Sequence, residues 1–270
     1  MPFTQNDGVK IYWDEKGKGE PVLLIMGLGW PSDMWHRTRP LLAEQYRTII
    51  FDNRGVARSD VPTGPYPIAT MASDAAAVLD AAGIGSAHLY GVSMGGMIAQ
   101  EFALQYPRRV KSLILGCTAS GGPQAKLPKP EVLEVLTRQG MTPEEAARAI
   151  NPYIYDETTP QARIDEDMEI RLQWTPTIEG YLAQLQGIMM WEAYSRIAKI
   201  SVPTLVLHGE TDQLVPAENG GMIAERISGS KLVMIPHASH IYSTDQPEAA
   251  HQPVLEFLSG QTGQSVASAR

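Results

Sequence analysis

The sequence predicts an α/β fold, with an open, mostly parallel, doubly wound sheet and an inserted helical cap. Short apolar runs alternate with longer segments of helical period along most of the 270 residues, and this alternation is typical of βαβ units. Over residues 118–200 the alternation stops and only helical patterns remain. Hydrophobic residues make up 43% of the chain and charged residues 19%, so a sizeable core can form.

Six short apolar runs are expected to form the buried strands of this sheet. They lack the alternation of apolar and polar residues that marks a half-exposed strand, as expected for a parallel sheet covered on both faces. The earlier stretch Val9–Glu15 partly alternates and is expected to be an antiparallel edge strand. The six runs are Val22–Met26, Thr48–Phe51, Ala87–Tyr90, Val110–Leu115, Thr204–Leu207 and Lys231–Ile235.

Helical patterns follow several of these runs. Ile68–Ala82 and Met97–Tyr106 are expected to cover the sheet. Inside the insertion, helices are expected over Glu131–Gln139, Thr142–Ala149 and Ile178–Met190, the second starting at a Thr-Pro-Glu-Glu sequence that favours a helix start.

The same reading divides the chain into parts. Residues 1–117 and 201–262 are expected to form the core, 118–200 the helical cap, and 263–270 a flexible tail. Open α/β sheets bind ligands at the carboxyl ends of their strands, so the cap is expected to lie over the ligand site.

Charge and composition exclude several function classes. The formal net charge is −8 and no run of Lys and Arg occurs, so nucleic acid is not expected as a partner. The first residues have neither a basic start nor an apolar run, and no stretch reaches about 18–20 apolar residues. We therefore expect no secretory signal and a cytoplasmic protein without membrane contact. The single cysteine, Cys117, is expected to be a small buried residue at a strand end. Oligomeric state is not predicted.

The candidate nucleophile is Ser93, in the sequence Gly-Val-Ser-Met-Gly between a predicted strand and a predicted helix. A serine hydroxyl is a weak nucleophile and must project to where a base can reach it. A sharp strand–turn–helix elbow achieves this, and the glycines at positions 91 and 95 relieve crowding with the neighbouring elements. The start of the following helix also directs backbone N–H groups toward a developing oxyanion.

A base for Ser93 is expected on a loop at the carboxyl end of a strand. The loop after Lys231–Ile235 contains two candidates, His237 and His240. A metal site on this pair would need a third ligand that no carboxylate cluster supplies, so neither a metal nor a cofactor is predicted. The other histidines are expected in the core, at His88 and His208, or at the surface, at His36 and His251.

An acid that orients the histidine is expected after another strand. The segment following Thr204–Leu207 offers Glu210 and Asp212. Either carboxylate could orient the imidazole and stabilise the imidazolium. The resulting chain order is serine, acid, histidine.

Several motifs in order resemble the α/β-hydrolase superfamily over nearly the whole chain, and within it the small bacterial esterases and 3-oxoadipate enol-lactonase-like hydrolases. The resemblance implies the α/β-hydrolase fold, and favours Asp212 as the acid and His240 as the base. The motifs are Gly-Val-Ser-Met-Gly-Gly-Met-Ile-Ala-Gln at 91–100, Asp-Asn-Arg-Gly-x-x-x-Ser-Asp at 52–60, Leu-His-Gly-x-x-Asp-x-x-Val-Pro at 207–216, and Ile-Pro-x-x-x-His at 235–240 with Gln-Pro-Glu at 246–248.

The reaction that the resemblance implies is acyl transfer on small carboxylic esters or lactones through an acyl-enzyme on Ser93. The oxyanion hole would consist of the backbone N–H groups of Leu28 and Met94. Where the family usually has His-Gly before the oxyanion residue, this chain has Met26 and Gly27. The same triad could instead serve perhydrolysis, carbon–carbon bond hydrolysis or lyase chemistry, or the chain could be a slow-turnover ligand receptor.

Large apolar residues of the cap, and of the loop that follows Val22–Met26 and contains Leu28 (the oxyanion loop), are expected to form a pocket wall. The candidates for substrate binding are Trp30, Trp174, Met190 and Trp191. Arg54 is a candidate for a substrate carboxylate, although a structural ion pair is the favoured interpretation.

Overall fold

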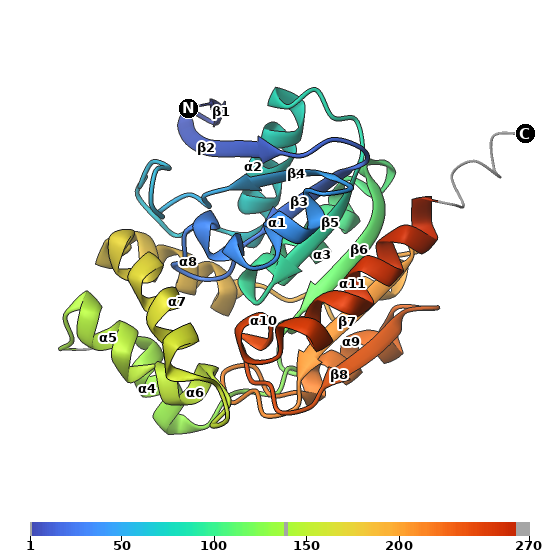
Figure 1. Cartoon of the computed structure of the whole chain (residues 1–270). Coiled ribbons are helices and arrows are strands. Elements are labelled where there is room, and N and C mark those ends of the chain that lie inside the picture. The colour runs from blue at the N-terminus through green and yellow to red at the C-terminus, as the bar shows by residue number, and fades with distance from the viewer. Residues whose placement is uncertain (1, 138–139, 263–270) are drawn as a thin grey trace, which may run out of the picture.

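A computed structural model describes residues 2–137 and 140–262. Within these residues eight strands form one sheet in the order β1-β2-β4-β3-β5-β6-β7-β8, shown in Figure 1. The pairs from β4 through β8 are parallel, whereas β1–β2 and β2–β4 are antiparallel. The strands are β1 (Phe3–Asn6), β2 (Val9–Lys16), β3 (Pro21–Ile25), β4 (Arg47–Phe51), β5 (Ala87–Val92), β6 (Val110–Gly116), β7 (Thr204–Gly209) and β8 (Lys231–Ile235).

The expected edge position of β2 is wrong, because β1 pairs outside it. Asp7 and Gly8 both have positive φ, 50° and 79°, and they turn the chain between the two strands. Asp-Gly is a strong signal for a two-residue hairpin. The signal was present in the sequence, but β1 is only four residues long and lacks an apolar run.

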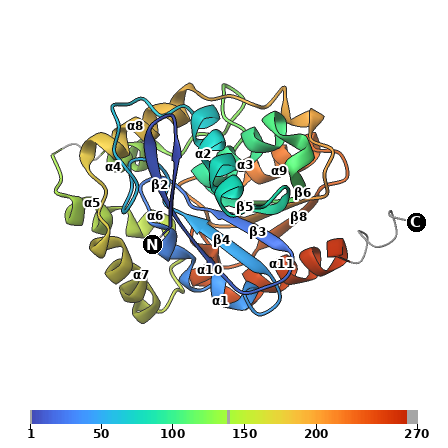
Figure 2. The ribbon, with the colours of Figure 1, turned by 90° about the horizontal axis from the view of Figure 1, so that it is seen from above.

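Helices cover both faces of the sheet. Figure 2 shows α2 (Ile68–Ala81), α3 (Met94–Gln105) and α9 (Glu218–Arg226) on one side, and α1 (Arg39–Leu42), α10 (Tyr242–Asp245) and α11 (Pro247–Thr262) on the other. Successive residues of β3 point to opposite faces and are buried in two different hydrophobic clusters: Leu23 and Ile25 in one, Val22 and Leu24 in the other. This two-sided burial is the physical reason that the strands are continuously apolar.

Between β6 and β7 the chain forms helices that gather at one end of the molecule (Figure 1). They are α4 (Pro130–Thr137), α5 (Pro143–Ala149), α6 (Asn151–Ile154), α7 (Gln161–Gln173) and α8 (Ile178–Met190). The 3₁₀ turn η3 (Ile197–Lys199) follows them and contacts α3 and α9. Their arrangement agrees with a helical insertion, and the proposed limits of core and cap stay a prediction. The last two residues of the expected helix 131–139 and the expected tail 263–270 lie outside the described residues.

Sequence periodicity misses α7 because this helix buries polar side chains. Asp167 and Arg171 are buried beside Met168, so no apolar stripe marks the inner face. By contrast, α5 begins with a capping box between Thr142 and Glu145, and that signal is visible in the sequence.

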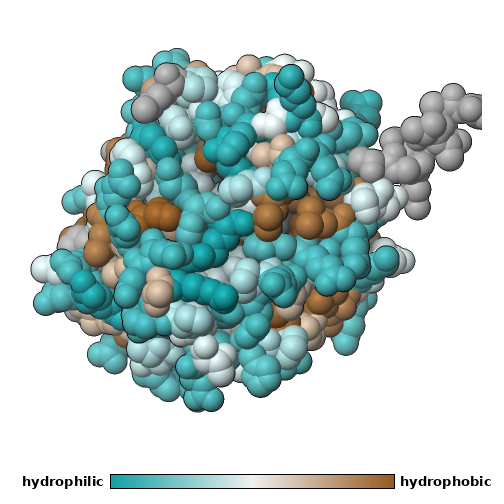
Figure 3. Space-filling model, in the orientation of Figure 1, coloured by the Kyte–Doolittle hydropathy of each residue, from teal (hydrophilic) through white to brown (hydrophobic). Residues whose placement is uncertain are grey.

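Two short 3₁₀ turns, η1 (Ser32–His36) and η2 (Pro107–Arg109), complete the elements. No helix in the described part of the chain is both long and apolar enough to cross a membrane. On the face in Figure 3, hydrophilic residues cover most of the surface and hydrophobic ones gather in separate patches.

Candidate functional site

Ser93 lies in a sharp turn between β5 and α3. Its backbone has φ 55° and ψ −124°, a conformation that is costly for a residue with a side chain. The Ser93 N–H donates to Gly116 O at 2.9 Å, which fixes the turn against the end of β6. A side chain at Gly91 would collide with the backbone of Gly95, and one at Gly95 with the backbone of Ile25, so the turn requires both glycines.

The loop after β3 lies directly against Ser93. A Cβ atom added at Gly27 would lie 3.1 Å from Ser93 Cβ and 3.6 Å from Ser93 Oγ. Leu28 follows and is half-buried. Met94 is the first residue of α3, where the backbone N–H has no partner within the helix. The sequence-predicted oxyanion residues therefore belong to the two segments that flank Ser93.

Asp212 and His240 lie together at the ends of β7 and β8. His240 Nδ1 is 2.9 Å from Asp212 Oδ2, and both residues are buried. The other carboxylate oxygen, Oδ1, accepts from the backbone N–H groups of Leu214 at 2.9 Å and Val215 at 2.8 Å. These bonds fix the carboxylate plane and direct its second oxygen at the imidazole.

The charges of this pair support one another. Burial raises the pKa of the Asp212 carboxyl, but the charge of His240 and hydrogen bonds from His208 and His240 lower it to about 2. Burial lowers the pKa of His240, yet Cys117 and the Asp212 carboxylate raise it well above its ordinary value. Cys117 is itself buried and follows the last residue of β6.

His208 is a second histidine partner of Asp212. Its Nε2 lies 2.8 Å from Val215 O and 3.3 Å from Asp212 Oδ2. Since a carbonyl can only accept, Nε2 carries the proton and donates to both oxygens. The alternative acid and base, Glu210 and His237, are exposed.

The remaining histidines differ partly from expectation. His88 is buried between Ser112 at 2.7 Å and Glu20 at 3.0 Å. His251 was expected at the surface, but it is buried and lies 2.9 Å from Thr38 Oγ1. The sequence pattern of α11 does not show that this position faces inward, because histidine is polar. In the structure the Thr38 hydroxyl is a buried hydrogen-bond partner for the ring. His36 is half-buried and bonds to Asp167.

Arg54 forms a buried ion pair with Asp74. Arg54 Nη2 and Nε lie 2.6 and 2.7 Å from the two carboxylate oxygens, and the exposed fractions of the side chains are 8% and 0%. This bidentate pairing agrees with the structural interpretation rather than with a substrate contact.

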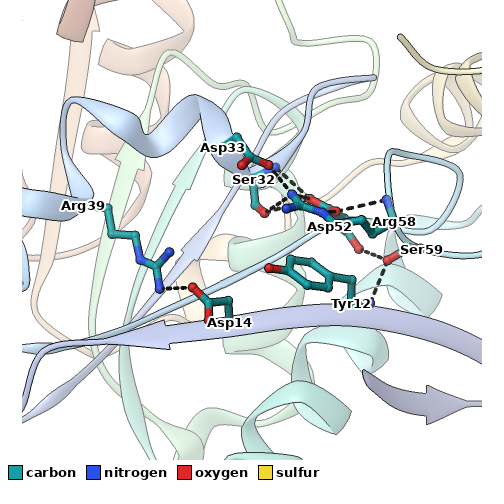
Figure 4. Close-up of polar contacts among 8 residues, drawn as sticks. All are labelled: Tyr12, Asp14, Ser32, Asp33, Arg39, Asp52, Arg58 and Ser59. Carbon is teal, nitrogen blue, oxygen red and sulfur yellow. Dashed lines mark hydrogen bonds and ion pairs between the residues drawn. The ribbon is translucent and has the colours of Figure 1, made fainter. Parts of the chain in front are cut away.

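The loop after β4 also holds the segment that follows β3 (Figure 4). Asp52 Oδ1 accepts from the backbone N–H and the hydroxyl of Ser32, at 2.8 and 2.7 Å. Arg58 Nε donates to Asp52 Oδ2 at 2.6 Å, and its guanidinium also pairs with Asp33. Ser59 Oγ in turn donates to Asp52 O at 2.6 Å.

Two of the four residues expected to bind substrate stack on arginines. Trp30 is half-buried, and the guanidinium of Arg171 lies 4.8 Å from its ring centroid. Trp174 follows α7 and lies 4.8 Å from the guanidinium of Arg58. Trp174 thus joins the insertion to the loop after β4.

The other two lie at the end of α8 and point to different surroundings. Met190 is 73% exposed, whereas Trp191 is buried. The indole N–H of Trp191 donates to Glu101 Oε2 on α3 at 2.8 Å. A role of either residue in substrate binding stays a prediction.

Sequence reasoning missed two buried polar residues of the insertion that reach the predicted site loops. Gln184 on α8 bonds to backbone groups of the loops after β3 and β4. Asp167 on α7 contacts His36, in the segment after β3, at 2.9 Å and Thr244, in the segment after His240, at 2.7 Å. No sequence signal identifies such partners, which lie 77 to 155 residues away.

Comparison with known proteins adds independent evidence. A family model described as the alpha/beta hydrolase fold matches residues 20–150, and one described as TAP-like protein matches 191–266. The chain is 30% identical to a proposed carbamate hydrolase, RutD, of Azorhizobium caulinodans, over 95% of this chain and 98% of that one. It is 29% identical to 3-oxoadipate enol-lactonase 2 of Acinetobacter baylyi, with 87% of each chain covered.

A solved structure is similar over its whole length. The thermophilic esterase from Thermogutta terrifontis has a TM-score of 0.83 and 30% sequence identity, with 96% of this chain and 97% of that chain covered. The sheet order, the family match and the full-length relatives agree: the chain belongs to the α/β-hydrolase fold family.

Proposed function

We propose that the protein is a serine hydrolase that cleaves small carboxylic esters or lactones through an acyl-enzyme on Ser93. The observation that carries this proposal is the buried contact of His240 Nδ1 with Asp212 Oδ2 at 2.9 Å, at the same sheet edge as the strained Ser93 turn. The relatives that are named as esterase and enol-lactonase support the substrate class.

The hydrogen bonds determine which nitrogen acts as the base. The Nδ1 of His240 donates to the Asp212 carboxylate, so Nε2 has a free lone pair that accepts the Ser93 proton. The Ser93 oxygen attacks the carbonyl carbon, and the Leu28 and Met94 N–H groups stabilise the negative oxygen. His240 then protonates the leaving alcohol, and a water molecule, deprotonated by the same nitrogen, releases the acid.

The test is turnover of p-nitrophenyl acetate, butyrate and octanoate, a small lactone and a p-nitrophenyl carbamate by the parent protein and Ser93→Ala. We expect turnover of an ester or the lactone, and a loss on the order of 10⁴-fold or more in the variant. Preference for the carbamate would correct the substrate class while keeping the nucleophile. Equal activity of parent and variant on every substrate would refute the assignment of Ser93.

A further inference from the structure

We propose that Gln184, on α8, is a positioning residue that fixes the oxyanion loop in its working conformation. The inference rests on the proposed function, because the loop contains Leu28. Gln184 has no exposed surface. Its Oε1 accepts the Gly29 N–H at 2.8 Å, and its Nε2 donates to Arg54 O at 2.8 Å.

These two bonds require a side chain with an acceptor and a donor on neighbouring atoms. The Gly29 backbone group is a donor and the Arg54 carbonyl is an acceptor, so the bridging group must accept at one atom and donate at its neighbour. Among side chains of this shape, the carboxamide of glutamine or asparagine supplies both whatever the pH, whereas a carboxyl does so only when it is protonated. A shorter asparagine could not span the same gap from the backbone of α8.

The oxyanion loop is held by hydrogen bonds before and after Leu28 in the chain. Before Leu28, Asn53 Nδ2 donates to Met26 O at 2.9 Å. After it, the Gly29 N–H donates to Gln184 Oε1. The two anchors limit rotation of the peptide units between them, including the unit that carries the Leu28 N–H. Hydrogen-bond donors that are oriented before the reaction stabilise an oxyanion without further reorganisation.

The backbone of α8 is closely packed against the loop after β4, so Gln184 starts from a fixed position. Tyr66 N–H donates to Ala183 O at 3.0 Å. A Cβ atom at Gly180 would collide with Gly55 O, and one at Gly187 with Tyr66 O. Small residues one and two turns apart thus let the helix backbone touch the loop.

The experiment compares three variants of the full chain. Gln184→Met removes both bonds at similar volume, and Gln184→Glu keeps an oxygen that accepts the Gly29 N–H. Gln186→Met is the matched control, because Gln186 is exposed on the same helix. Steady-state kinetics, binding of a trifluoromethyl ketone and hydrogen exchange of a peptide that contains Gly29 are measured at a temperature where each variant is folded.

We expect Gln184→Met to lower kcat about ten- to a hundredfold with KM changed less than about threefold. The affinity for the trifluoromethyl ketone, whose adduct has a tetrahedral oxyanion, falls by a similar factor, and exchange at Gly29 accelerates. Gln184→Glu recovers part of kcat, and Gln186→Met equals the parent protein.

Three results would overturn the inference: unchanged kcat and ketone affinity in Gln184→Met, loss of thermal stability alone, or unchanged exchange at Gly29. A parent protein that is inactive toward every ester and lactone and unreactive toward the ketone refutes the proposed function instead. The exchange measurement still decides in that case whether Gln184 holds the loop.

Discussion

Asp212 has two histidine neighbours, and their geometry separates their roles. His240 Nδ1 is 2.9 Å from Asp212 Oδ2, whereas His208 Nε2 is 3.3 Å from the same oxygen and 2.8 Å from Val215 O. The His208 Nε2–H group therefore donates to the Val215 carbonyl as well as to the Asp212 carboxylate. Its surroundings hold the acid in place, while His240 contacts the same carboxylate from the loop after β8.

The first prediction concerns this carboxylate. Asp212→Asn should lower kcat by a factor on the order of 10³–10⁴, because an amide no longer stabilises the imidazolium or its tautomer. His240 is active when neutral, and its raised pKa places the acid limb of kcat/KM above pH 6.5. The limb should move to lower pH in Asp212→Asn, as measured by pH profiles of both proteins.

The exposed Glu210 provides the control for that prediction. Glu210→Gln should leave kcat and the acid limb unchanged, because the carboxylate faces solvent. If Glu210→Gln loses activity and Asp212→Asn keeps it, the acid has been assigned to the wrong residue.

The Arg54–Asp74 pair leads to a second prediction. Arg54→Met leaves a buried carboxylate unpaired and should reduce the free energy of unfolding by about 3–5 kcal/mol. The double variant Arg54→Met with Asp74→Leu should recover most of this loss. Urea unfolding measures both. A variant that is as stable as the parent but has a raised KM for acidic substrates alone would make Arg54 a substrate-binding residue.

At the scale of elements, local sequence patterns predicted the helices and strands that have one or both faces apolar. The run Lys231–Ile235 coincides with β8, and Ile178–Met190 with α8. β1 and α7 were missed, because β1 depends on a turn and α7 on buried polar residues. The elbow was predictable since its glycines and serine are local, whereas Gln184 bonds to Gly29, 155 residues away.

A third prediction tests the close packing of α8. Gly187→Ala should displace the helix and destabilise the protein by about 1–3 kcal/mol, because the new Cβ meets Tyr66 O. Gly221→Ala, within α9, is the matched control: no heavy atom lies within 4 Å of its added Cβ. It should be neutral or stabilising by up to about 1 kcal/mol. Thermal unfolding that gave both variants the same change would argue against the contact.

At the scale of the whole molecule, the insertion and the strand-end loops are joined by buried polar contacts. Thr159 Oγ1 donates to Asp245 Oδ1 at 2.6 Å, and the Ser239 N–H donates to Asp245 Oδ2 at 2.7 Å. Asp245 therefore ties a residue of the insertion to the residue that precedes His240. The sequence could not predict this connection, because it depends on how two distant segments meet.

A fourth prediction follows from the pKa of Asp245. Burial raises this pKa from 3.8 to about 6, against hydrogen bonds from Thr159 and Ser239 that lower it. The folded state therefore binds the proton more tightly, so the stability from this group is present below pH 3.8 and is lost as pH rises through about 6. Two pKa units correspond to about 3 kcal/mol.

Asp245→Asn should remove that dependence. Between pH 4 and pH 7 the parent should lose up to about 3 kcal/mol of unfolding free energy relative to the variant. Urea unfolding at both values measures it. A constant difference would show that Asp245 ionises normally in the folded protein.

The central claim is that Ser93 forms an acyl-enzyme with its substrate. The most direct measurement is mass spectrometry of the protein after acid quench during turnover of p-nitrophenyl butyrate, followed by peptic digestion. We predict an added acyl group on the peptide that contains Ser93, absent in Ser93→Ala and accumulating in Asp212→Asn if deacylation slows more than acylation. An acyl group on another residue, or turnover without any covalent intermediate under conditions that trap a known acyl-enzyme, would contradict the account.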